Sequence, residues 1–210
     1  MLRKETVEPR TLELLKKLMQ MPELVSFALL GGTSLALRWG HRRSEDLDLF
    51  SNAYFNEDET ISALEESFTA LIISRQEKQT LSLFIDDVKV EIISPKRPYL
   101  KPFETIENIR FFSVEDTMAF KMNAVERRGS KKDFYDLHEA LKHYSLSEII
   151  GFYKQKFLTS DVGNLLKSIT YFEDAENDPD FEILTGVPWP KVKKSTLKKF
   201  ELYMKQQIGK

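Results

Sequence analysis

Two kinds of hydrophobic pattern follow one another along the chain and divide it into two parts. In the first part, helical spacing of apolar residues alternates with short apolar runs rich in β-branched residues. Helices are predicted over 11–19, 33–39 and 56–70, and strands over 25–30, 46–50, 70–76, 80–85 and 88–94. After residue 113 helical spacing dominates, over 115–128, 131–143, 146–157, 162–175 and beyond residue 190. The pattern therefore predicts an α/β domain over residues 1–105 and an all-helical domain over 106–210.

Two carboxylates interrupt the strand expected over 46–50. Alternate residues of a strand share a face, so Asp46 and Asp48 should point the same way while Leu47 and Leu49 enter the core. Adjacent carboxylates repel each other, and a bound cation would relieve that repulsion. A solvated strand edge is the simpler interpretation of this Asp-x-Asp pair by itself.

A third acid, Glu91, stands in the otherwise apolar run Val90, Ile92 and Ile93. If its strand lies beside the one that holds Asp46 and Asp48, three carboxylates converge as a Mg²⁺ site with open positions for phosphate oxygens. The alternative is an outward-facing position on an antiparallel strand, since Lys89 and Glu91 alternate with buried residues.

Composition narrows the kinds of site that are possible. The 210 residues include no cysteine and three histidines without ligand spacing, which excludes thiolate zinc sites and a cysteine nucleophile and favours hard cations. No apolar run approaches the roughly 20 residues that span a bilayer. The charged N-terminus is unlike a secretory signal, so we expect a cytoplasmic protein with no membrane partner.

A double glycine precedes the predicted helix over 33–39. Without Cβ atoms, Gly31 and Gly32 would let backbone N–H groups approach a triphosphate, and the N-terminus of the helix would face the same anion. Thr33 or Ser34 would add a hydroxyl donor. An ordinary turn is the alternative interpretation.

The helical half carries its own charged positions. Lys121 and Arg128 lie on one helical face with Met118 and Ala124, which suggests a shared anion; an exposed lysine on an amphipathic helix is the alternative. Asp133, near the start of the next helix, either stabilises that helix end or faces the active site.

These motifs resemble a known family. "GGTSLALRWGHRRSEDLDLF" is similar to the first motif of DNA polymerase beta-like nucleotidyltransferases, and in detail to the AbiEii/AbiGii toxin branch. The matching positions are Gly31, Gly32, Thr33, Leu35, Arg42, Ser44, Asp46 and Asp48. "DTMAFKMNAVERRGSKKDFYDLHEAL" resembles the later motifs of the branch through Lys121, Arg127 or Arg128, Asp133 and Asp136. The chain departs from many relatives at Glu91, where they carry aspartate, and at Lys131-Lys132, where an arginine often precedes the aspartate.

The resemblance implies a fold, a site and a reaction. The fold would be α+β, a polymerase beta-like α/β half with a mixed sheet followed by a helical bundle that completes the cleft. Two Mg²⁺ ions would be held by Asp46, Asp48 and Glu91, with Lys121 and Asp133 as further catalytic residues. The nucleoside triphosphate would contact Gly31, Gly32, Thr33, Ser34, Arg42, Ser44, Lys121 and Arg128.

The acceptor is less constrained than the nucleotide. The resemblance implies RNA, such as a tRNA 3′ end, and a toxin whose antitoxin is a separate protein. Basic clusters at 38–43, 127–132 and 191–199 favour a polyanionic acceptor, although the net charge is −2. A small hydroxylated acceptor such as an aminoglycoside, a protein acceptor, and a nucleotide-binding protein without turnover are the alternatives.

Overall fold

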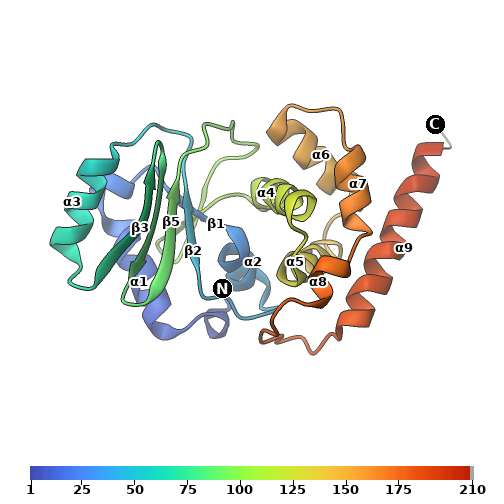
Figure 1. Ribbon diagram of the computed structural model, residues 1–210, viewed down its shortest axis with the longest axis horizontal. Helices are drawn as coiled ribbons and strands as arrows, with labels where there is room; N and C mark the ends of the chain where they lie inside the picture. The colour runs from blue at the N-terminus through green and yellow to red at the C-terminus, as the bar shows by residue number, and fades with distance from the viewer. Residues whose placement is uncertain (209–210) are drawn as a thin grey trace. The chain divides into compact units, whose positions relative to one another are not determined.

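The chain folds into two compact units, and the boundary between them in the sequence follows Ser113. The computed structural model describes residues 1–208, and Figure 1 traces them. The first unit is Met1–Ser113, and the second begins at Val114. The expected division after residue 105 falls inside a strand, because the sheet of the first unit continues to residue 111.

A seven-stranded mixed sheet forms the centre of the first unit (Figure 1). Its strands run in the order β3-β4-β5-β2-β1-β7-β6. Their bounds are β1 Ala28–Leu30, β2 Leu47–Phe50, β3 Leu71–Glu77, β4 Thr80–Ile85, β5 Val88–Ile93, β6 Glu104–Ile106 and β7 Ile109–Phe111. The pairs β2/β5 and β1/β7 are parallel, and the other pairs are antiparallel. The expected α+β class with a mixed sheet is confirmed.

Two hairpins show how local sequence sets the strand ends. Asp86 and Asp87 take φ values of 48° and 64° between β4 and β5, which is the conformation of a two-residue primed turn and agrees with the strands expected over 80–85 and 88–94. Glu107 and Asn108 take φ values of 51° and 64° between β6 and β7. This second hairpin was not predicted, because its strands are three residues long and follow a proline-rich segment.

Helices α1 (Pro9–Gln20), α2 (Gly31–Trp39) and α3 (Glu57–Ser67) complete the first unit with two short 3₁₀ turns, Lys4–Thr6 and Pro22–Leu24. Asn56 caps α3 by accepting hydrogen bonds from the N–H groups of Asp58 and Glu59. Arg110 of β7 ties the N-terminal segments to the sheet, since it donates to the carbonyls of Met19, Leu24 and Phe27 at 2.8–2.9 Å. These hydrogen bonds therefore hold the segments before β1 against the sheet.

The second unit is built from helices (Figure 1). They are α4 Val114–Arg127, α5 Lys131–Ala140, α6 Leu146–Phe157, α7 Gly163–Ile169, α8 Glu173–Glu176 and α9 Trp189–Ile208. The single helix expected over 162–175 is interrupted after Ile169 and continues as the short α8. Lys156 donates to Asp116 at 2.5 Å in the interior, so a buried ion pair joins α6 to α4. No helix within residues 1–208 combines the length and apolar character that a membrane crossing requires.

Candidate active site

The two aspartates of the first motif stand at the start of β2. Asp46 directly precedes the strand and is exposed, while Asp48 is its second residue and is half-buried. Leu47 and Leu49 are fully buried on the opposite face. The strand thus separates an apolar face from a face that carries the carboxylates, as its alternation predicts.

Glu91 lies beside Asp48. The parallel pairing of β2 with β5 sets Asp48 opposite Glu91, and residues that are opposite each other in neighbouring strands project from the same face of the sheet. The sheet therefore brings together two acids that are 43 positions apart in the chain. The third acid, Asp46, lies two residues before Asp48 and directly ahead of β2.

Two neighbours hold the Glu91 carboxylate. Ser82 of β4 donates its hydroxyl to Oε2 at 2.6 Å, and Nζ of Lys89 lies 3.1 Å from Oε1. The hydrogen bond with Glu91 raises the pKa of Lys89 above its usual value, against the cost of partial burial. The negative charges of Glu91, Asp46 and Asp48 raise it further.

Sequence reasoning missed both Ser82 and Lys89 as members of the site. The spacing of Lys89 and Glu91 on one strand places them on one face, which was visible in the sequence. Ser82 required the β4/β5 register, in which it stands opposite Glu91.

Gly31 and Gly32 form the first turn of α2 rather than a loop before it. Gly31 has a φ of 73°, and a Cβ atom there would lie 1.9 Å from Oδ2 of Asp48. A Cβ atom at Gly32 would lie 2.2 Å from a guanidinium nitrogen of Arg42. The glycines therefore allow a carboxylate and a guanidinium group to approach the start of a helix.

Two of the hydroxyl residues of the motif, Thr33 and Ser44, hold the chain before β2. The Thr33 side chain is hydrogen-bonded to the carbonyl of Asp46 and, at 2.9 Å, to the Ser44 hydroxyl. Ser34 is fully buried, and its hydroxyl oxygen has no hydrogen-bond partner within residues 1–208. Arg42 is buried and donates to the carbonyl of Arg43 at 2.9 Å. In this structure Thr33, Ser44 and Arg42 position the segment that leads to Asp46.

The donor set suits a hard divalent cation, since Asp46, Asp48 and Glu91 offer carboxylate oxygens without nitrogen or sulfur ligands. Within residues 1–208, however, no three acidic or histidine side chains already converge closely enough to hold a metal ion. Glu91 instead points its oxygens toward Ser82 and Lys89. Metal ligation by all three acids would require Glu91 to exchange partners.

A hollow of about 380 Å³ opens beside Asp46. The start of α1, the segment before β2 and the β4–β5 hairpin line it, and its charged residues are Glu8, Arg10, Glu45, Asp46, Asp87 and Lys89. Four of these six side chains are acidic.

In the second unit, Lys121 of α4 lies between two aspartates of α5. Its ammonium group is 2.9 Å from Asp133 and 2.7 Å from Asp136, and all three side chains are buried. Asp133 also accepts from the Ser130 hydroxyl at 2.8 Å and from the Ser130 backbone N–H at 3.3 Å, and the second bond belongs to a capping box at the start of α5. The predicted positions Lys121, Asp133 and Asp136 thus form one ion-paired cluster.

Arg128 joins this cluster from the surface. Its Nε lies 3.2 Å from Asp133, and its side chain is 68% exposed. Burial opposes the ionisation of Asp133, but the charges of Lys121 and Arg128 outweigh it, so the pKa of Asp133 lies below its ordinary value. Asp133 is therefore an ionised member of the cluster at neutral pH.

The three basic clusters differ in what they expose. In the first, Arg38 is ion-paired with Glu104 at 2.8 Å and Arg42 is buried. In the second, Arg127 and Lys132 are exposed, whereas the Lys131 side chain donates to the carbonyl of Asp178. The first cluster is mainly structural.

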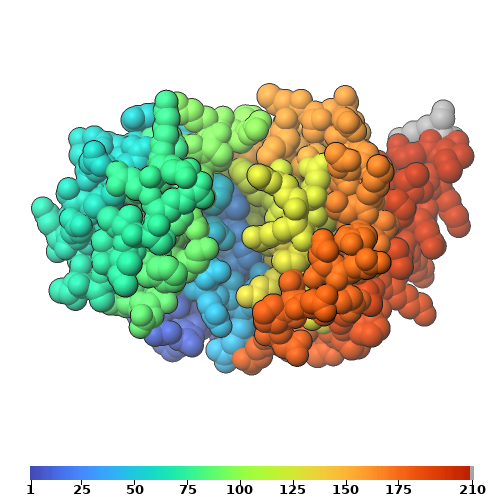
Figure 2. Space-filling model, viewed as in Figure 1, coloured from blue at the N-terminus to red at the C-terminus, as the bar shows by residue number. Residues whose placement is uncertain are grey.

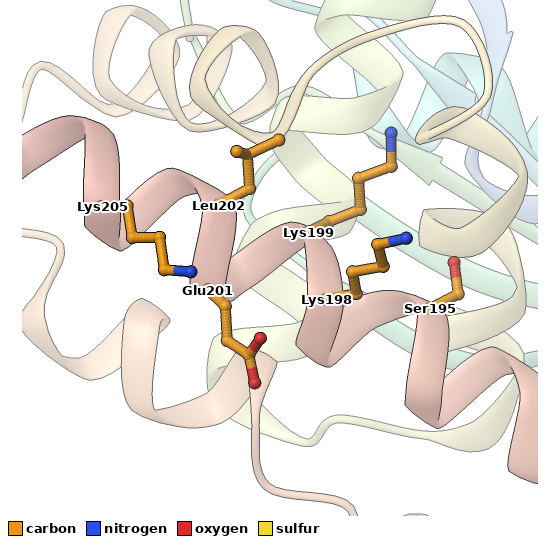
Figure 3. A pocket seen from close by; sticks show the side chains of 6 residues that line it. All are labelled: Ser195, Lys198, Lys199, Glu201, Leu202 and Lys205. Carbon is orange, nitrogen blue, oxygen red and sulfur yellow. The ribbon is translucent and has the colours of Figure 1, made fainter.

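Helix α9 carries six lysines and one glutamate, and four of the six lysines are exposed. Its side chains lie at the surface of the space-filling view, drawn in red in Figure 2. Lys198, Lys199 and Lys205 line a hollow of about 490 Å³ with Ser195, Glu201 and Leu202 (Figure 3).

Known proteins share this fold. MenT4, a nucleotidyltransferase toxin from Mycobacterium tuberculosis H37Rv, superposes with a TM-score of 0.59 at 15% identity, over 94% of this chain and 84% of that one. JHP933 from Helicobacter pylori superposes with a TM-score of 0.55 at 18% identity, over 97% of both chains. At these identities the likeness concerns the fold, and the expected nucleotidyltransferase fold is confirmed.

Sequence comparison identifies the family. Residues 13–186 match the family described as nucleotidyl transferase AbiEii toxin, type IV TA system. A curated relative, the uncharacterized protein aq_aa25 of Aquifex aeolicus (strain VF5), is 33% identical over 171 residues, which cover 79% of this chain and 83% of that protein. The chain belongs to the AbiEii family and is a nucleotidyltransferase. Membership in a type IV toxin–antitoxin family implies a nucleotide substrate and an antitoxin partner.

Proposed function

We propose that the protein transfers a nucleotide from a nucleoside triphosphate to RNA, with tRNA as the expected acceptor, and that Mg²⁺ supports the reaction. The observation that carries this proposal is the register of β2 and β5, which sets Asp48 beside Glu91 while Gly31 leaves room against Asp48. Nucleotidyl transfer mainly requires neutralised phosphate charge and in-line positioning, and a carboxylate-held metal supplies the first of these.

The proposal gives each candidate site residue of the first unit a role. Asp46 and Asp48 hold the cation, and Glu91 completes its ligands or receives the proton of the acceptor hydroxyl. The start of α2 presents backbone N–H groups to the phosphates at Gly31 and Gly32. Thr33 and Ser44 keep the segment before β2 in place through the Asp46 carbonyl.

The second unit contributes Lys121 and Arg128 as phosphate-binding residues. The partners of Lys121, Asp133 and Asp136, hold its ammonium group in one position. Arg128 is largely exposed and already faces an anion, the Asp133 carboxylate. A phosphate oxygen would replace that contact with a charge-assisted hydrogen bond of the same kind.

RNA is the proposed acceptor because of α9. A polyanion releases counterions when it binds exposed lysines, so its affinity falls steeply with salt. Lys191, Lys194, Lys198 and Lys205 are exposed on this helix. The chain would thus bind RNA through exposed lysines that are not catalytic residues.

A small cationic acceptor is the second candidate, and one observation favours it. The hollow beside Asp46 carries four acidic side chains against two basic ones, which would attract an aminoglycoside-like molecule. The two candidates therefore differ in where the acceptor binds and in how its binding responds to salt.

The test is to incubate the protein with each labelled nucleoside triphosphate and Mg²⁺, together with total RNA and small hydroxylated acceptors. We expect label in RNA, none with the Asp46→Asn variant, and a loss of RNA labelling as salt rises. The double variant Lys198→Gln/Lys205→Gln should label RNA less well, whereas Lys17→Gln/Lys78→Gln, which removes two exposed lysines of the first unit, should not. Label found only in small molecules would reject RNA as the acceptor.

A further inference from the structure

Lys89 places an ammonium group among the candidate metal ligands. Its Nζ lies 3.1 Å from Oε1 of Glu91. The charges of Asp46 and Asp48 also act on it. The nucleotidyltransferase motifs give this lysine no role, although it shares the strand face of Glu91.

The sheet explains why a cation is needed at this point. Asp48 and Glu91 stand opposite each other in register, and like charges in that relationship repel. Asp46 adds a third negative charge one alternation away. In the protein without metal, Lys89 offsets this repulsion.

We propose that Lys89 is the built-in counter-ion of the three carboxylates and that a divalent cation must displace it to bind. This inference rests on the metal site of the proposed function. A divalent cation bound to Glu91 would stand close to the ammonium group, and the two positive charges would repel each other. Binding of the metal and retention of the Lys89–Glu91 pair are therefore mutually unfavourable.

The surroundings of Lys89 allow the exchange. Its side chain is 44% exposed, and a flexible four-carbon stem carries its ammonium group. The ammonium group can therefore leave Glu91 without disturbing the core. It also lines the hollow beside Asp46, where Asp87 and Glu8 supply other negative charges. Ser82 is hydrogen-bonded to Oε2 of Glu91, so Oε1 is the oxygen that Lys89 would release to the cation.

Two consequences follow for metal binding. Lys89 lowers the affinity of the site for a divalent cation below that of the three carboxylates alone. It also stabilises the metal-free sheet, because the Glu91 carboxylate is ion-paired there. A surface ion pair on another element, such as Lys16 with Glu13 of α1, would affect neither quantity.

The test measures Mn²⁺ binding without nucleotide, by electron paramagnetic resonance of the free ion. We expect Lys89→Met to bind Mn²⁺ about tenfold more tightly than the wild type, because the competing charge is gone. Lys89→Arg, which keeps the charge, should bind about as the wild type does. The matched control Lys78→Met removes an exposed lysine from the β3–β4 turn of the same sheet and should leave the affinity unchanged.

Thermal unfolding gives an independent measurement on the same variants. Metal-free Lys89→Met should unfold at a lower temperature than the wild type, and Mn²⁺ should raise its Tm by more. Lys78→Met should show neither change. A variant that fails to fold at room temperature would be replaced by Lys89→Gln, which keeps a polar side chain on this exposed face.

The outcomes separate the two ideas. If Asp48→Asn abolishes Mn²⁺ binding while Lys89→Met binds like the wild type or more weakly, the metal site stands and the role of Lys89 is rejected. If Asp48→Asn binds Mn²⁺ as well as the wild type does, the metal site of the proposed function fails and the inference about Lys89 fails with it. Tighter binding by Lys89→Met that Asp48→Asn removes supports both.

Discussion

Oδ2 of Asp48 lies 1.9 Å from the position that a Cβ atom at Gly31 would take. A side chain at Gly31 is therefore incompatible with the observed place of the carboxylate. The same glycine has a φ of 73°, a conformation that costs other residues roughly 1–2 kcal/mol. Sterics and backbone conformation thus require glycine at this position independently.

Gly31→Ala should abolish nucleotidyl transfer and lower the free energy of unfolding by more than the backbone cost of about 1–2 kcal/mol. The additional loss comes from displacing Asp48. Gly186→Ala is the matched control, because Gly186 has a φ of 64° and nothing within 4 Å of the added Cβ atom. Chemical denaturation of both variants checks this, and equal destabilisation would show that the approach to Asp48 contributes nothing.

Asp46→Asn should abolish transfer while leaving the free energy of unfolding equal or higher, since it removes one of several neighbouring negative charges at an exposed position. Glu45→Gln removes the adjacent exposed charge, which lines the same hollow, and should keep its activity. Transfer assays and thermal melts of the two variants test this. Loss of stability in Asp46→Asn with activity retained would identify Asp46 as a structural residue.

Lys121→Ala should destabilise the second unit by about 3–5 kcal/mol, because it leaves Asp133 and Asp136 buried without their shared cation. Its effect on nucleotide binding has to be measured at a temperature where the variant remains folded. A loss below about 1 kcal/mol in denaturant unfolding would contradict the importance of this buried pair.

Arg128→Ala separates phosphate binding from stability. Its side chain is largely exposed, so the loss of stability should be below about 1 kcal/mol. Calorimetry should show weaker binding of the nucleoside triphosphate, by roughly 1.5–3 kcal/mol for a lost charge-assisted hydrogen bond. Lys142→Ala, which breaks an ion pair with Glu139 on the same unit, should bind the nucleotide normally. Unchanged binding in Arg128→Ala would exclude Arg128 from the nucleotide site.

The lowered pKa of Asp133 predicts an acid-sensitive contribution to stability. A carboxyl group whose pKa is lower in the folded than in the unfolded chain stabilises the fold fully above its unfolded pKa of about 4. That contribution is lost as the pH falls from about 4 through the folded pKa. Asp133→Asn should show a flatter fall of unfolding free energy over this acid range. Parallel curves for the variant and the wild type would contradict the assignment.

The sequence predicts most elements correctly where the pattern is local. The strands on either side of Asp86-Asp87 and the alternation around Asp48 depend on neighbouring residues and are confirmed. The β6–β7 hairpin escaped because three-residue strands carry too little periodicity. The helix over 162–175 was predicted too long, since its break after Ile169 has no proline or glycine to mark it.

The site was less predictable than the elements, since its geometry depends on long-range pairing. The Asp-x-Asp motif made Asp46 and Asp48 candidates and an interrupted apolar run made Glu91 one, but only the parallel β2/β5 pair sets Glu91 beside Asp48. Gly31 and Gly32 were expected in a loop and instead begin α2. The ion pairs of Lys121 with Asp133 and Asp136 agree with the helical spacing of these residues. The place of Lys89 in the site could be recognised only once the structure showed which carboxylates surround it.

The register of Asp48 with Glu91 also bears on when the protein can become active during its synthesis. Asp48 leaves the ribosome well before Glu91, and α3, β3 and β4 lie between them in the chain. β2 cannot gain its parallel partner until β5 has been made, and such long-range pairing forms slowly. A nascent chain that ends before β5 therefore holds two of the three carboxylates of the proposed metal site, and that site cannot be completed until most of the sheet has been made.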